Sequence, residues 1–202
     1  MKTIGAIACL AGGLLWAAKM AFDWLGLDRE VNRAYPPSHA TDQIEFLVPL
    51  LCIGGVIALV GRWRGALGSS PALLTAGLAL FAAFHYSDAH LTGASLPFGL
   101  LFMLTGHLLM IAGALLLARR LRRAADAPRA LSAAAFAIFA AALATCLTPF
   151  AYGSLSNAGD TALTVCCTIA SGLGWAALGG VLLGVESRNA REGASTKGRP
   201  VA

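Results

Sequence analysis

Three side chains that bind metals or move protons lie close together at the end of an apolar stretch: His85, Asp88 and His90. On a helix, His85 and Asp88 share a face because they are three residues apart, whereas His90 lies about 140° from His85. Imidazole and carboxylate suit zinc, copper, iron or nickel, but a metal site usually has three or four protein ligands. There are therefore two interpretations of the segment. It is part of a metal or proton-linked site, or it is simply the polar end of a helix. Further ligands would come from His39, Asp42 or Asp160.

A fourth histidine, His107, falls near the middle of the apolar stretch 97–118. Ionisable residues at that depth in a bilayer are costly and are therefore functional candidates. A neutral imidazole bonded to a hydroxyl, from Thr105 or Thr148, or to a backbone carbonyl would make His107 a core residue. The alternative is a pathway or proton relay through His107.

An acidic residue, Glu45, would stand at the outside mouth of that pathway. It lies three residues after Asp42, and this spacing is typical of a capping pair that opens a helix. Lys19 and Asp23 are four residues apart, which allows an ion pair on one helix. These acids therefore have structural interpretations beside the functional one.

Motifs of known chemistry are missing from the sequence. It contains no phosphate-binding loop of the Walker type and no Cys-x-x-Cys-His haem attachment motif. All five cysteines fall in apolar stretches, where they are expected to pack as small side chains. Catalytic residues and cofactors are not indicated by the sequence.

The elements that must position these residues are transmembrane helices. The chain has 202 residues, of which 57% are hydrophobic and 12% charged, too apolar a composition for a small soluble domain. A spanning helix needs about 20 mostly apolar residues. Six stretches satisfy this requirement, which predicts an all-α membrane protein, a compact six-helix bundle in residues 1–185 with no sizeable soluble domain. The predicted spans are 4–24, 43–61, 71–90, 97–118, 129–150 and 162–184.

The distribution of charge predicts the orientation, because Lys and Arg are retained in cytoplasmic segments. With the N-terminus inside, the inside segments hold 12 of the 15 basic residues and the outside segments hold seven of the ten acidic ones. Both termini are then cytoplasmic, and residues 186–202 are expected to form a disordered cytoplasmic tail. The excess of positive charge is explained by topology, so no nucleic-acid partner is expected. The lipid bilayer is the expected partner.

Small residues at four-residue spacing predict close helix packing, because small side chains let helix backbones approach within lipid. One such row is Gly172, Ala176, Gly180 and Gly184, and another runs along the first span. These rows could face other helices of the same chain or a second copy in a homo-oligomer. The second row consists of Gly5, Cys9, Gly13 and Ala17.

Three function classes follow from these observations. The first is a non-enzymatic binding, accessory or sensory component of a bacterial cytoplasmic membrane, and it is favoured by the lack of catalytic motifs. The second is a small transporter or channel-like protein with a pathway near His107 and Glu45. The third is a membrane enzyme or redox protein that binds a metal or haem through His85, Asp88, His90 and His107.

Overall fold

The computed structural model describes residues 2–25, 40–90, 96–151 and 157–197, which form six helices and no strand. Each helix coincides with one of the apolar stretches predicted from the sequence. Most are longer than predicted, because polar residues at the ends of an apolar stretch continue the helix. The helices are α1 (Lys2–Trp24), α3 (Ala40–Leu67), α4 (Ser70–His90), α5 (Leu96–Arg123), α6 (Arg129–Ala151) and α7 (Asn157–Lys197).

Among the described residues, five helices are long and apolar enough to cross a membrane: α1, α3, α5, α6 and α7. The described apolar part of α4, Ser70–Tyr86, is shorter. The all-helical architecture and the membrane character predicted from composition are therefore confirmed to this extent.

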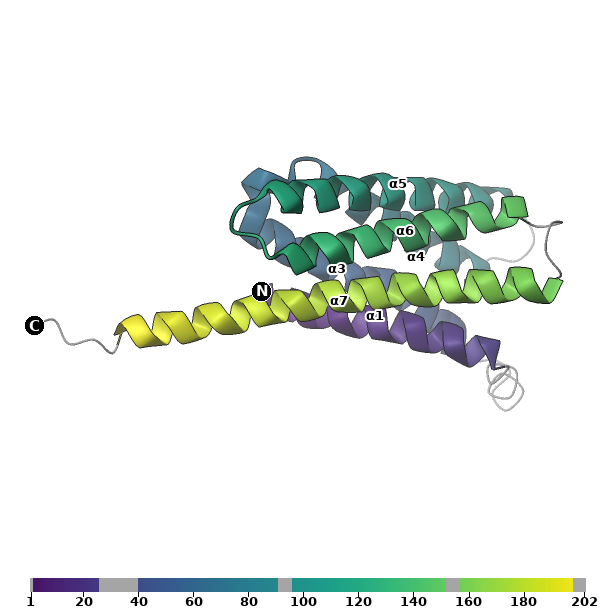
Figure 1. Ribbon diagram of the computed structural model, residues 1–202. Helices are drawn as coiled ribbons and strands as arrows, with labels where there is room; N and C mark the ends of the chain where they lie inside the picture. The colour runs from purple at the N-terminus through teal and green to yellow at the C-terminus, as the bar shows by residue number, and fades with distance from the viewer. Residues whose placement is uncertain (1, 26–39, 91–95, 152–156, 198–202) are drawn as a thin grey trace, which may run out of the picture.

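The helices pack in a ring in which each helix contacts its neighbours in the chain (Figure 1). The largest sets of contacts join α1 to α3, α3 to α4, α4 to α5, α5 to α6 and α6 to α7, and the ring is closed by α7 against α1. Successive helices run in opposite directions, so that α1 begins and α7 ends toward the same side (Figure 1). Residues far apart in the sequence thereby meet in the middle of the ring.

Glycine allows the closest approach between helices within the chain. A Cβ at Gly13 of α1 would overlap backbone atoms of Gly172 and Ala176 of α7. Gly13 of the α1 row therefore faces α7 of the same chain, whereas Gly5 of that row packs against Gly54 and Ala58 of α3. The row on α7 differs from the predicted one, because Gly179 packs against α1 while Gly180 has no neighbour that would meet a Cβ. The predicted four-residue spacing fails after Ala176 because a straight helix repeats every 3.6 residues.

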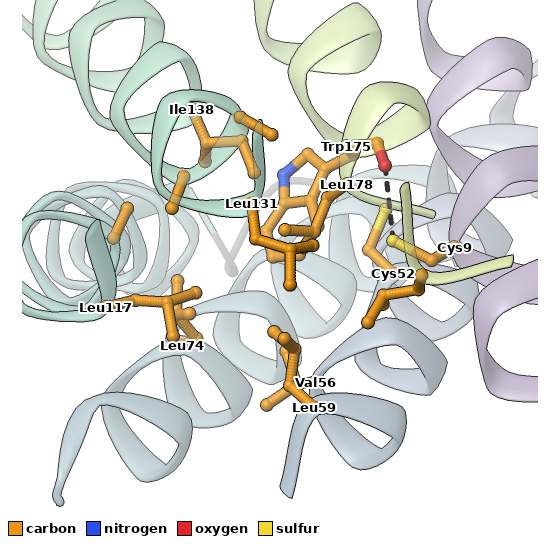
Figure 2. Packing of buried hydrophobic residues seen from close by; sticks show 14 of the residues in the cluster. Cys9, Cys52, Val56, Leu59, Leu74, Leu117, Leu131, Ile138, Trp175 and Leu178 are labelled. Atoms are coloured by element: carbon orange, nitrogen blue, oxygen red, sulfur yellow. Dashed lines mark hydrogen bonds between the residues drawn. The ribbon is translucent and has the colours of Figure 1, made fainter. Parts of the chain in front are cut away.

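One half of the ring, here called the packed half, is filled by large apolar side chains. It lies toward the α3–α4 and α5–α6 connections, and all six helices contribute buried side chains to it (Figure 2). Trp175 is completely buried there, and its carbonyl oxygen accepts a hydrogen bond of 3.3 Å from the Cys9 thiol. The residues labelled in Figure 2 include Val56, Leu59, Leu74, Leu117, Ile138 and Leu178.

Polar contacts join the helices at the end of the packed half. The indole Nε1 of Trp63 donates a hydrogen bond of 2.9 Å to Asp126, which lies between α5 and α6. The guanidinium of Arg62 lies 3.7 Å from the carboxylate of Glu186 and 3.4 Å from the side-chain oxygen of Asn189. Helix α7 continues past residue 186, where the sequence predicted a disordered tail, and ends at Lys197. The contacts with Arg62 lie at the start of this continuation.

Candidate functional site

A cavity of about 240 Å³ lies inside the ring, in the half opposite the packed one, here called the cavity half. All six helices contribute to its walls. It follows that no part of the chain forms this site alone. The lining residues are Trp16, Lys19 and Met20 of α1, Glu45 and Val48 of α3, Phe81, Phe84 and His85 of α4, Met103, His107 and Met110 of α5, Ala142 and Thr145 of α6, and Thr168 and Ser171 of α7.

A charged group at one end of the cavity connects three helices. The ammonium of Lys19 is bonded to the carboxylate of Glu45, and the other carboxylate oxygen lies 3.1 Å from Nδ1 of His85. The Lys19 side chain is only 10% exposed, and a charge with so little access to water requires a partner of opposite sign. Glu45 supplies that partner, and α1, α3 and α4 are held together at this point.

An aromatic side chain separates the two histidines of the cavity. The ring of Phe81 lies edge-on to His85, with the centroids 5.2 Å apart, and edge-on to His107, with the centroids 4.6 Å apart. Trp16 of α1 completes this wall, with its centroid 5.9 Å from that of Phe81. The cavity is therefore charged at the end near Glu45 and aromatic farther in.

The tautomer of His107 follows from its hydrogen bond. Its Nδ1 lies 2.9 Å from the carbonyl oxygen of Met103, one turn earlier in α5. A carbonyl only accepts hydrogen bonds, so Nδ1 carries the hydrogen, and Nε2 of the neutral ring keeps a free lone pair. His107 is 8% exposed and lines the cavity. The imidazole thus offers an acceptor or ligand atom inside the protein.

Two hydroxyl groups of the cavity wall, those of Thr145 and Thr168, also offer lone pairs. Thr145 donates to the carbonyl of Ala141, and Thr168 donates to that of Thr164, each at 2.9 Å. Because their hydrogens are used within their own helices, the two oxygens retain lone pairs.

The structure brings together some of the residues singled out in the sequence. His85, His107 and Glu45 line one cavity. The side chains of Asp88 and His90 lie outside the described residues, as does that of Asp23. Of the two kinds of partner considered for His107, a hydroxyl or a backbone carbonyl, the structure shows the carbonyl of Met103.

Glu45 differs from its structural interpretation as part of a capping pair. Helix α3 begins at Ala40, so Glu45 lies inside the helix and its carboxylate bonds Lys19 and His85. The predicted start at residue 43 was too late because residues 40–42, which include the polar Thr41 and Asp42, are also helical. The role of Lys19 and Met20 in the cavity was missed, since contacts between distant helices leave no local pattern in the sequence.

Among the described residues, no group of three or more His, Cys, Asp or Glu side chains could hold a metal ion. Cys9 and Cys52 are buried and, like the other cysteines, form no disulfide. A metal site built from these residue types alone is therefore not formed within the described ranges.

Comparison with known proteins gives no assignment. The chain matches no protein-family model, and no characterised protein or solved structure is similar enough to it to suggest a function. Its function has to be inferred from the cavity.

Proposed function

We propose that this chain is a non-enzymatic binding protein of a bacterial cytoplasmic membrane and that it holds a small molecule or ion inside its ring of helices. The observation that carries the proposal is the cavity of about 240 Å³ to which all six helices contribute. Interiors of proteins are normally packed without voids much larger than a water molecule. A void of this size with polar groups on its walls is typical of a ligand site.

The walls favour a ligand with one polar and one apolar part. Lys19, Glu45 and His85 provide charge at one end, while Trp16 and Phe81 provide aromatic surface farther in. The mixture of an apolar lining with a few fixed polar groups is what orients a small ligand. The hydroxyls of Thr145 and Thr168 donate to carbonyls of their own helices and not to a base, as a nucleophile would, which favours binding over catalysis.

The proposal is tested by filling the cavity. In Ala142→Leu, three additional carbon atoms enter the space in front of a buried alanine that lines it. The purified protein is screened by melting temperature against a panel of metal ions and small aromatic amines and acids. We expect at least one probe to raise the melting temperature of the wild type and to leave Ala142→Leu unchanged.

The matched control is Ala140→Leu, two residues earlier on the exposed side of α6. It makes the same chemical change outside the cavity and should respond to the probes as the wild type does. A panel in which every probe shifts wild type and Ala142→Leu equally would show that the cavity is not a binding site.

A second candidate function is transport, because titratable groups follow one another along the cavity wall. Glu45 lies 3.1 Å from His85, and the rings of His85 and His107 both contact Phe81. Such a sequence of groups suits a proton or cation pathway. A flux of protons or cations into proteoliposomes that is lost in His107→Gln would favour transport over binding. An equal flux in the wild type and in His107→Gln would exclude a pathway through His107.

The orientation that accompanies this proposal is six crossings with both termini in the cytoplasm. Helix α4 has 21 residues, enough for a length of about 30 Å, and the basic residues alternate from segment to segment as six crossings require. Reporter fusions after residue 202 and between residues 36 and 37 test it. The first should be active only as a cytoplasmic reporter and the second only as an external one; the same side for both would contradict six crossings.

A further inference from the structure

The methionines of this chain gather at one place. The sequence contains four, and Met20, Met103 and Met110, which are all of them except Met1, line the cavity. By contrast, the largest fully buried side chains are Trp, Leu, Ile and Val, with no methionine among the described ones. Met110 belongs to the buried apolar cluster and Met20 and Met103 pack against it, so the thioethers stand where that cluster borders the cavity.

Three of the residues concerned lie on one face of α5. Met103, His107 and Met110 follow one another at spacings of four and three residues, which places them on the same side of a helix. Met20 reaches the cavity from α1. Met110 is 2% exposed and His107 is 8% exposed, whereas Met20 and Met103 are half-buried, so the inner part of this wall is shielded from the surroundings.

The atoms on this wall are donors of lone pairs. Each thioether sulfur has lone pairs and no hydrogen. The Nε2 atom of His107 likewise has a lone pair and no hydrogen, because the hydrogen of the neutral ring is on Nδ1, which donates it to the carbonyl of Met103. A histidine that binds a metal through one nitrogen commonly donates its other N–H to a carbonyl, which fixes the ring. The hydrogen bond of His107 matches that arrangement.

We propose that Met20, Met103, Met110 and His107 bind a soft univalent metal ion, Cu(I), in this cavity. Thioether ligands select Cu(I), whereas zinc and magnesium prefer thiolate, imidazole or oxygen. A single positive charge also suits an apolar cavity better than a double charge does, because the cost of leaving water rises with the square of the charge. The inference rests on the proposed function, since it names the ligand of the same cavity.

The test is a titration of the purified full chain with Cu(I) under anaerobic, reducing conditions, with bathocuproine disulfonate as the competing chelator. Thiols also bind Cu(I), so all proteins carry substitutions of the five cysteines by alanine or serine. We expect one Cu(I) per chain, the same stoichiometry with Ag(I), and no comparable binding of Zn(II).

Met103→Leu and Met110→Leu remove sulfur while nearly conserving volume, so the fold should be retained. Each should weaken Cu(I) binding by about tenfold or more. His107→Gln should do the same. The matched control is Leu108→Met, which places a thioether on the exposed side of α5 and should not change the affinity or the stoichiometry.

Binding that is unchanged in Met103→Leu and Met110→Leu would overturn the inference, because the metal would then be held elsewhere. Absence of Cu(I) binding in the cysteine-free chain would also overturn it. In that case the response of Ala142→Leu to the organic probes separates the two proposals. If the response to the organic probes depends on the cavity, the proposed binding function holds but the ligand is not Cu(I). If no probe gives a response, both proposals are wrong.

Discussion

The two halves of the ring are built from the same six helices but are filled in different ways. In the packed half, Trp175, Leu117 and Ile138 are almost completely buried. In the cavity half, the same helices present Glu45, His85 and the methionines around an open space. Of the twelve largest fully buried side chains described, only Val48 lines the cavity.

The comparison separates the source of stability from the site of binding. Close packing gives each buried side chain many dispersion contacts, and an empty space removes them. The packed half can therefore hold the helices together while the cavity half carries polar groups that contribute less to packing. Substitutions should accordingly cost more stability in the packed half and more ligand binding in the cavity half.

The largest difference is expected between two tryptophans. Trp175→Ala should lower the free energy of unfolding by about 4 kcal/mol, because it leaves a large void in a completely packed region. Trp16→Ala should cost less than half of that, since the side chain already borders an open space. Both are measured by reversible unfolding in mixed micelles. Equal losses would contradict the distinction between the halves.

Trp175→Phe is the conservative variant for the same position. Within the described residues, the indole Nε1 of Trp175 has no hydrogen-bond partner, so its removal costs no hydrogen bond. The loss should stay near 1 kcal/mol, which corresponds to the smaller ring volume. A much larger loss would indicate a bond from Nε1 that the structure does not contain.

A smaller effect is expected at the contact between α1 and α7. Gly13→Ala should destabilise the protein by about 2 kcal/mol, because the new methyl group meets the backbone of Gly172 and Ala176. Gly180→Ala, on the exposed side of α7, meets no neighbour and should be neutral or slightly stabilising. Thermal unfolding of the two variants in detergent compares them. A neutral Gly13→Ala would contradict the close approach of the helices.

A small difference is expected between the two ion pairs, one in the cavity half and one at the end of the packed half. Glu45→Gln removes the negative charge that bonds Lys19 and His85, and should cost about 1.5 kcal/mol. Glu186→Gln, in the more exposed pair with Arg62, should cost about 0.5 kcal/mol or less. Denaturant unfolding at low ionic strength measures both. A larger loss in Glu186→Gln would reverse the expected importance of the two pairs.

The helices could be predicted because their cause is local. An apolar stretch of about 20 residues has few alternatives to a helix in a membrane, so all six positions were recognised within a few residues at most ends. The exception is α7, whose end at Lys197 was missed. Glu186 and Asn189, at the start of its continuation, contact Arg62, a residue of another helix.

The site was predictable only in part. His107 was singled out because ionisable groups are unusual in apolar stretches, and Glu45 was singled out as the outside mouth of a pathway through His107. The partner of His85 could not be predicted, since Glu45 is 40 positions away in the numbering and on another helix. The row of Met103, His107 and Met110 was visible in the sequence, but a methionine at helical spacing is more often a core residue. Only the position of these three residues at the cavity suggests that the row takes part in binding.

The closure of the ring by α7 against α1 has a consequence for biogenesis. Helix α7 leaves the ribosome after the other five helices and supplies the final wall, including Thr168 and Ser171, so the cavity is incomplete until α7 has been inserted. Until then Gly13 of α1 lacks the cover that Gly172 and Ala176 provide. A product truncated before α7 would expose this part of α1 to the bilayer and to membrane-bound proteases, which could thereby recognise it.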